Sequence, residues 1–75
     1  MIEENTIITL GENHRYLVAF STIYNNINYV FLTNIDNVLD TYFYEYKGND
    51  NLSLVKDEKL IEELLNIYKK EKILD

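Results

Sequence analysis

The sequence contains no cysteine and no proline, and only two of its 75 residues are glycine. Without cysteine the chain forms no disulfide and offers no thiolate to a metal ion. Zinc sites combine several Cys and His side chains, so the single histidine, His14, does not supply enough ligands for one. Because disulfides are rare in reducing compartments, the lack of cysteine favours a cytoplasmic protein.

Positive charge is also scarce. One arginine and six lysines stand against thirteen acidic residues, so the net charge is −6 and the isoelectric point is near 4.6. Proteins bind nucleic acids and anionic lipids through clustered Lys and Arg that neutralise phosphate groups. We therefore expect no direct binding to DNA or RNA and none to a membrane.

Long apolar runs are missing as well. The longest stretch without charge, residues 16–35, has the length of a membrane span, but four asparagines interrupt it. Asn25-Asn26, near its middle, is typical of a β-hairpin turn. Glu3 and Glu4 stand where a secretory signal carries basic residues. The sequence thus predicts one soluble domain with no signal peptide and no anchor.

The chain does contain short β-branched and aromatic runs that Gly, Asn and Asp separate, which is the pattern of strands and turns. These runs predict five strands, at about residues 6–10, 14–24, 27–33, 41–47 and 52–55. The segments 11–13, 25–26 and 48–51 are turn candidates, since Gly and Asn tolerate positive φ. The polar segment 34–40 is expected to be a connection with room for one helical turn.

The second and third runs lack a regular alternation of apolar and polar residues. Val18, Ala19 and Phe20 are consecutive, and residues 29–32 are apolar throughout. Such runs indicate strands that are covered on both faces, either in the middle of the sheet or at a subunit contact.

From Asp57 onward the apolar spacing changes to that of a helix. We predict a helix over residues 58–70, with Asp57 as its N-cap. Its apolar stripe consists of Leu60, Ile61, Leu64, Leu65, Ile67 and Tyr68. The stripe does not continue, so we expect residues 71–75 to be a frayed tail. The fold class is α+β, a small antiparallel β-meander of about five strands packed against one C-terminal α-helix.

No group of residues has the spacing of a catalytic or metal site. His14 has no evident partner to orient it as a general base, so we interpret it as a surface residue beside a turn. The oxygen-rich segment 34–40 fails the EF-hand pattern, because Val38 and Leu39 occupy a ligand position and the glycine position. We predict no enzyme activity, no metal and no cofactor.

Seven tyrosines and three phenylalanines are the unusual feature of the composition. In residues 41–47 the tyrosines alternate with other residues and therefore share one face of a strand, which we expect to be packed while the other face is wet. That face can pack beneath the helix, form a protein interface or stack nucleic-acid bases. Stacking is disfavoured because such platforms carry a positive groove. The candidate interaction surface consists of Tyr24, Tyr29, Tyr42, Tyr44 and Tyr46.

Several stretches, taken in order, resemble a known family of small acidic bacterial proteins, the domain of unknown function numbered 1292. They are residues 7–10, 25–32, 42–46, 52–55 and 57–64. The resemblance implies a sheet-plus-helix fold and a cytoplasmic location in a bacterium. It supplies no catalytic residues, because that family has no established activity. The chain departs from the family pattern at Asn25-Asn26, where glycine is usual, and in the segment 34–40, which is less acidic.

Our leading hypothesis is a non-enzymatic protein–protein interaction or accessory domain. The absence of a catalytic constellation, the tyrosines on strands and the apolar central hairpin all favour it. A second hypothesis is an acidic nucleic-acid mimic that occupies the basic groove of another protein, in which case binding weakens steeply with salt. The partner is in either case a protein, and a homodimer is compatible with the apolar hairpin.

Overall fold

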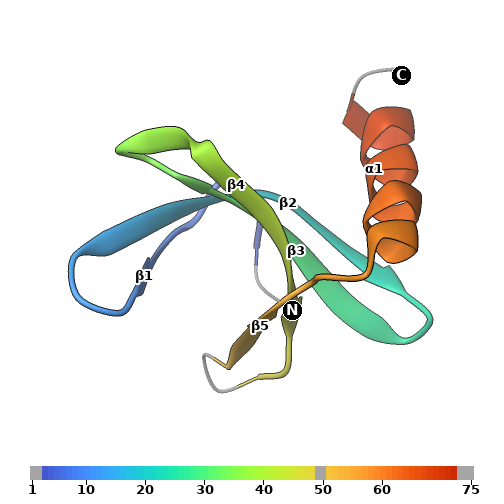
Figure 1. Ribbon diagram of the computed structural model, residues 1–75, viewed down its shortest axis with the longest axis horizontal. Coiled ribbons are helices and arrows are strands. Elements are labelled where there is room, and N and C mark those ends of the chain that lie inside the picture. Colours follow the sequence, from blue (N-terminus) through green and yellow to red (C-terminus); the bar gives the residue numbers. More distant parts are fainter. Residues whose placement is uncertain (1–2, 49–50, 73–75) are drawn as a thin grey trace.

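A computed structural model describes residues 3–48 and 51–72 of the chain. Five strands form one antiparallel sheet in the order of the sequence, and a single helix follows them (Figure 1). The elements are β1 (Ile7–Leu10), β2 (His14–Tyr24), β3 (Ile27–Asn34), β4 (Asn37–Tyr46), β5 (Leu52–Leu54) and α1 (Glu58–Lys72). The predicted α+β class, a meander packed against a C-terminal helix, is confirmed.

Residues with positive φ make the turns between the strands. Asn25 and Asn26 have φ of 52° and 64°, as a two-residue type I′ hairpin turn requires. Gly11 and Asn13, with φ of 63° and 65°, close the turn between β1 and β2. Both turns were predicted from composition. Gly48, with φ of 85°, opens the turn between β4 and β5, whose residues 49 and 50 lie outside the described part.

The segment 34–40 is not the connection that the sequence predicts. β3 continues to Asn34, residues 35–36 alone form the turn, and β4 begins at Asn37 rather than near Thr41. Two asparagine side chains shorten the connection. Asn34 Oδ1 accepts the N–H of Asp36 at 2.9 Å, and Asn37 Oδ1 accepts the N–H of Leu39 at 3.2 Å. Such side-chain bonds to nearby backbone stabilise a tight turn, so the polar composition indicates a hairpin.

A β-bulge in β2 explains the uninterrupted run Val18-Ala19-Phe20. Val18 pairs with Leu32 and Phe20 pairs with Phe31, so β2 has one residue more than β3 between these pairs. The extra residue directs Val18 and Phe20 to opposite faces of the sheet. Both side chains are nearly inaccessible, with exposures of 0% and 1%. The prediction that the central strands are covered on both faces is confirmed, and the covering residues belong to the same chain.

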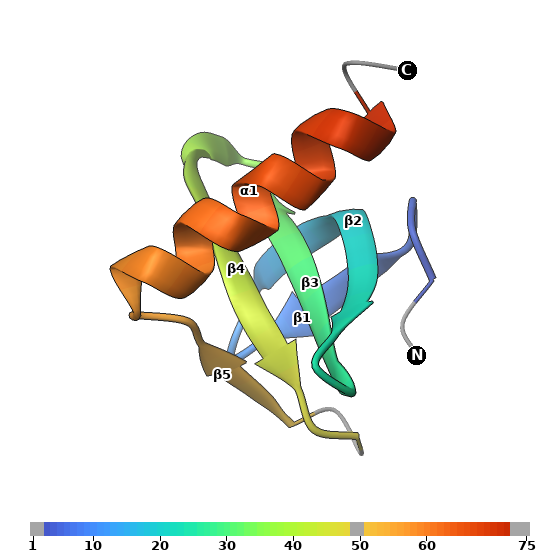
Figure 2. The same ribbon diagram turned by 90° about the vertical axis from the view of Figure 1, so that its right-hand side faces the viewer.

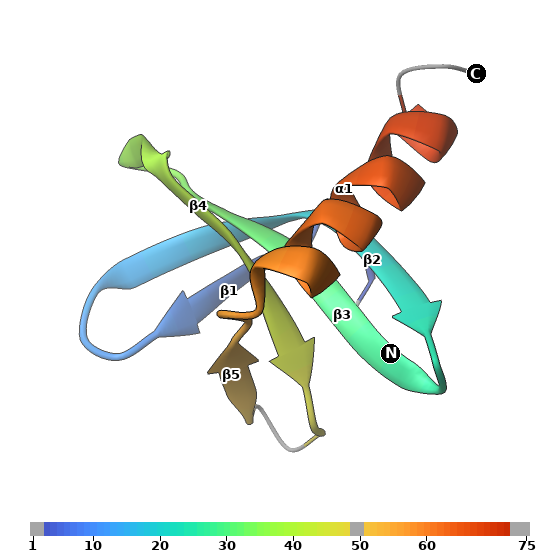
Figure 3. The same cartoon turned by 45° about the vertical axis from the view of Figure 1, so that its right-hand side comes forward.

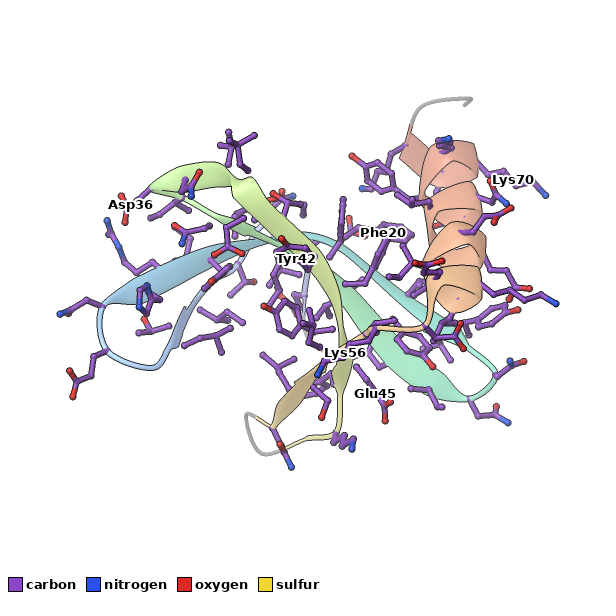
Figure 4. All side chains as sticks on the ribbon, viewed as in Figure 1. Phe20, Asp36, Tyr42, Glu45, Lys56 and Lys70 are labelled. Atoms are coloured by element: carbon purple, nitrogen blue, oxygen red, sulfur yellow. The ribbon has the colours of Figure 1, made fainter. Side chains whose placement is uncertain are left out.

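The outer core lies between the sheet and α1, which crosses β4, β3 and β2 diagonally (Figure 2). Its buried members are Phe20, Tyr29, Phe43, Val55 and Leu64. The other five residues of the predicted helix stripe pack around them. Phe20 points from the sheet toward the helix (Figure 4), where the ring of Tyr68 meets it edge-on at 5.4 Å.

The inner core lies on the other face of the sheet, which curls around it (Figure 3). Its buried members are Tyr16, Val18, Val30 and Leu32, and Ile8, Leu10, Tyr44 and Leu52 pack against them. Residues of the first and last strands thus meet the same cluster. A strand order of β1 to β5 makes this contact only if the sheet is strongly curved.

The tyrosines of β4 alternate as predicted, but their face does not lie beneath the helix. Phe43 pairs with Phe31 and is buried under α1, whereas Tyr44 packs in the inner core. Glu45, on the helix side with Phe43, is half-buried rather than wet. Alternation identifies the two faces of a strand, but the charges of β4 do not tell which one the helix covers.

Polar contacts hold both ends of α1. Asp57 Oδ1 accepts the N–H groups of Lys59 at 3.0 Å and of Leu60 at 3.4 Å, so the predicted N-cap is confirmed. The helix extends to Lys72, two residues beyond the predicted end. Lys72 Nζ lies 2.6 Å from Glu4 Oε1, and Glu4 Oε2 accepts the N–H of Ser21 at 3.2 Å.

Glu4 therefore joins the last helical turn to the edge of β2. This long-range contact lies in a turn beyond the apolar stripe, and the helix ends two residues after the predicted end at about Lys70. Residues 73–75, the rest of the predicted tail, lie outside the described part of the chain.

Replacing Leu64 by alanine is expected to unfold much of the protein. Leu64 is completely buried, and such truncations cost about 2–5 kcal/mol. That is close to the roughly 3–5 kcal/mol that a core of this size supplies. Urea unfolding followed by circular dichroism measures the effect. Asn66→Ala, at an exposed position of the same helix, is the matched control. Equal stability of the two variants would contradict the placement of Leu64 in the outer core.

The substitution Glu4→Gln tests the contact between α1 and β2. Pairing with Lys72 lowers the pKa of Glu4 below its ordinary value of 4.5. The carboxylate thus contributes stability above that value, and the contribution is lost as the pH falls through the lowered pKa. Glutamine can still accept the N–H of Ser21. We expect the variant to be less stable than wild type at pH 7 and equal to it in strong acid.

Denaturant unfolding as a function of pH, at low and high salt, measures this difference. Salt should shrink it, since the pair is partly exposed. Glu12→Gln removes an exposed carboxylate from the β1–β2 turn and serves as the control. The contact has no energetic role if both variants follow the same pH profile.

Candidate interaction site

The five tyrosines of the predicted interaction surface do not share one surface. Tyr29 is 5% exposed beneath α1, and Tyr24 packs against the same core. Tyr44 belongs to the inner core, and Tyr46 is half-buried at the end of β4. Tyr42 alone is largely exposed, at 51%. The candidate surface predicted from the tyrosines is therefore reduced to Tyr42.

The packed tyrosines act as neutral members of the fold. The hydroxyl of Tyr24 donates to the carboxylate of Glu63 on α1, and this bond raises the pKa of Tyr24. Burial raises the pKa values of Tyr29 and Tyr44. All three side chains therefore remain uncharged at neutral pH and take part in packing.

A pocket of about 260 Å³ opens between α1 and the sheet. Its lining consists of Phe31, Thr41, Tyr42, Phe43, Val55, Ile61 and Leu65. Phe31 and Phe43 contribute a stacked pair of rings with centroids 4.2 Å apart. None of these seven described residues carries a charge. The volume is close to the lower end of about 300 Å³ for pockets that bind small organic ligands, and it is large enough for one or two side chains of a protein.

The tip of the hairpin between β3 and β4 carries two exposed apolar residues, which precede in the chain the residues of β4 that line this pocket. Val38 is 70% exposed and Leu39 is 86% exposed. The tip projects away from α1 (Figure 1), and Figure 4 places Asp36 at its end. Residues 38–40 have no register partner on β3, because Asn34 pairs with Asn37 while Thr33 pairs with Thr41.

Sequence reasoning missed Val38 and Leu39 because it assigned them to a polar connection. The available signal was the pair itself, two large apolar residues in a segment otherwise rich in Asn and Asp. A segment that is a tight hairpin has no room to fold these side chains inward. Val38 and Leu39 therefore remain exposed, and residues that follow them on β4 (Thr41, Tyr42 and Phe43) line the pocket.

A polar network fixes the base of the hairpin. The hydroxyl of Tyr16 donates to Asp40 Oδ2 at 2.6 Å, and Asn34 Nδ2 donates to the same oxygen at 3.3 Å. The bond to Asp40 raises the pKa of Tyr16. Thr41 Oγ1 donates to the carbonyl of Val38 at 2.6 Å. The side chains of Asn34, Asn37 and Asp40 in segment 34–40 thus bind one another or the nearby backbone.

The remaining sequence candidates lie apart from the pocket. His14 is exposed at the start of β2, opposite Leu10. Within residues 3–48 and 51–72, no group of three or more His, Cys, Asp or Glu side chains could hold a metal ion. The one helix described, α1, lacks the length and apolar character needed to cross a membrane.

Replacing Tyr16 by phenylalanine is expected to lower the free energy of unfolding by about 1.5–3 kcal/mol, the range for a hydrogen bond to a charged group. The change removes the hydroxyl donor to the half-buried carboxylate of Asp40 and leaves it the longer bond from Asn34. Urea unfolding measures it, with Tyr46→Phe, at a half-buried tyrosine, as the control. If Tyr16→Phe matches the control, the network does not stabilise the hairpin.

Comparison of this chain with protein-family models, with curated proteins and with solved structures finds no match. No relative therefore assigns roles to the residues of the pocket or of the hairpin tip. The resemblance to the domain of unknown function numbered 1292 stays a prediction. The interpretation of the site rests on the chemistry of its own residues.

Proposed function

We propose that this chain is a non-enzymatic protein–protein interaction domain. Its docking surface, called here the β4 surface, consists of the pocket described above together with the exposed side chains of Val38, Leu39 and Tyr42. The observation that carries the proposal is the adjacency of an open apolar pocket and exposed apolar side chains on one strand. Single exposed apolar residues are common on proteins, whereas a contiguous group beside a pocket marks an interface.

The chemistry of the pocket defines what the partner presents. Five of its seven lining residues are purely apolar, so the complementary anchor is an aliphatic or aromatic side chain. Burying one such side chain contributes about 1.5–3 kcal/mol. A micromolar complex needs about 8 kcal/mol. The exposed residues around the pocket must therefore be buried together with the anchor, which favours a partner surface over a free small molecule.

The distribution of charge supports this proposal over the nucleic-acid mimic. A mimic needs carboxylates arranged without interruption, as phosphates are along a strand. On α1 the exposed surface carries lysines (Lys59, Lys69 and Lys70) as well as the acids Glu58 and Glu62. The β4 surface lacks charge at the pocket altogether. The net charge of −6 remains the one feature that favours the mimic.

The lack of cysteine further supports a cytoplasmic location for this interaction.

Affinity capture from the lysate of the source cells, at low and at high salt, tests the proposal. The wild-type protein is expected to retain a partner at both salts, because apolar contacts do not weaken with salt. Tyr42→Ala should weaken retention at least about tenfold, the loss of 1.4 kcal/mol or more that is typical of an aromatic anchor. Ile23→Ala removes an apolar side chain of similar exposure, 61%, far from the pocket and should retain the partner.

Each other outcome has a definite meaning. Loss of the partner in both variants, or in neither, places the interface outside the β4 surface. A basic nucleic-acid-binding protein that is released at high salt supports the mimic instead. Absence of any retained partner, together with a monomeric purified protein, overturns the interaction domain.

A further inference from the structure

We infer that the partner at the β4 surface is a second copy of this chain. In this arrangement the hairpin tip of each copy inserts into the pocket of the other, which gives a dimer with two-fold symmetry. The inference rests on the proposed function, because it uses the same surface and names its occupant. It concerns purified protein and needs no other component.

The chain carries both halves of a complementary contact. Val38 and Leu39 protrude with exposures of 70% and 86%, so neither side chain fills a pocket of its own chain. The pocket has the volume of one or two side chains and an apolar lining. An aliphatic tip is the anchor that such a lining selects. In a single copy both the tip and the pocket are left without a partner from the described residues.

The positions of the tip and the pocket on β4 allow the contact to close. Leu39 belongs to the tip, while Thr41, Tyr42 and Phe43 line the pocket. A two-fold axis that passes near the middle of this short stretch exchanges the two features. When Leu39 of one copy reaches the pocket of the other, the reverse contact forms at the same time. Such an isologous interface uses every tip and every pocket, so it ends at two copies.

Side chains rather than a continued sheet would make this contact. β5 pairs only with residues 44–46 of β4, so the outer edge of β4 from Asn37 to Tyr42 has no neighbouring strand within the described part of the chain. The N–H of Leu39 and the carbonyl of Val38 are already bonded, by the side chains of Asn37 and Thr41. The edge is therefore poorly suited to a ladder of backbone bonds, whereas the side chains of Val38, Leu39 and Tyr42 are exposed.

Electrostatics restrict where two copies can meet. Each copy carries a net charge of −6, so copies repel one another in general. Between Asn37 and Phe43 the only charged residue is Asp40, and the hydroxyl of Tyr16 and the amide of Asn34 both donate to its carboxylate. By contrast, the charged side chain of Glu4 covers the edge of β2. Two copies that meet at the β4 surface therefore bury apolar side chains where few charges oppose one another.

Sedimentation equilibrium of the purified protein over a range of concentrations tests the inference. We expect a reversible monomer–dimer equilibrium that shifts toward dimer as salt screens the repulsion. Leu39→Ser should raise the dissociation constant at least about tenfold, whereas Ile23→Ser should leave it unchanged. Circular dichroism of both variants confirms that they are folded before they are compared.

A second measurement locates the contact independently of affinity. The chain has no cysteine, so Leu39→Cys and Tyr42→Cys each introduce a single thiol. Under mild oxidation a mixture of these two variants should form a mixed disulfide faster than Leu39→Cys mixed with Ile23→Cys. Equal rates for the two mixtures overturn the inserted-tip arrangement.

Failure of this inference is distinct from failure of the proposed function. A protein that is monomeric at every concentration and salt overturns the dimer. If a lysate partner sensitive to Tyr42→Ala is then found, the interaction domain stands with a different occupant. A dimer that Leu39→Ser does not weaken overturns the inference by placing self-association on another face.

Discussion

The β-bulge at Ala19 is the feature on which the rest of the structure depends. Without it, Val18 and Phe20 would lie on one face of β2, and one of the two cores would lose a fully buried side chain. With it, a single strand supplies Val18 to the inner core and Phe20 to the outer core. A chain of 75 residues that buries only about 60% of its surface gains from using both faces of its sheet.

Polar contacts between distant segments then determine the outline of the molecule. The carboxylate of Asp40 accepts a hydrogen bond from the hydroxyl of Tyr16, 24 residues away, and this bond anchors the hairpin that projects from the sheet. Glu4 contacts both Ser21 and Lys72, so one carboxylate joins the amino-terminal segment, a strand edge and the helix end. These bonds involve partly exposed groups. Their main effect is to position the β3–β4 hairpin and the last turn of α1, which the apolar cores do not hold in place.

The β4 surface follows from the way in which α1 crosses the sheet. The helix packs its stripe on Phe20, Tyr29 and Phe43, and its diagonal course leaves the pocket open beside Ile61 and Leu65. A single helix of 15 residues cannot cover the outer face of five strands. The pocket and the exposed apolar tip of the β3–β4 hairpin together form the interface that we propose.

Local chemistry was enough to predict much of this fold from the sequence. Asn25-Asn26 encodes its turn through positive φ, Asp57 caps the helix that follows it, and the spacing from Leu60 to Tyr68 specifies the buried stripe. In each case the cause lies within a few residues of its effect. The apolar run 18–20 also indicated strands covered on both faces.

Whatever depends on contacts between distant residues could not be obtained in this way. The side of β4 that meets the helix depends on register with Phe31, the end of α1 depends on Glu4, and the burial of Tyr29 depends on α1 itself. The site belongs to this second group. Its pocket combines residues from β3, β4 and α1 that are up to 34 positions apart (residues 31 to 65), because a cavity exists only where separate elements pack incompletely.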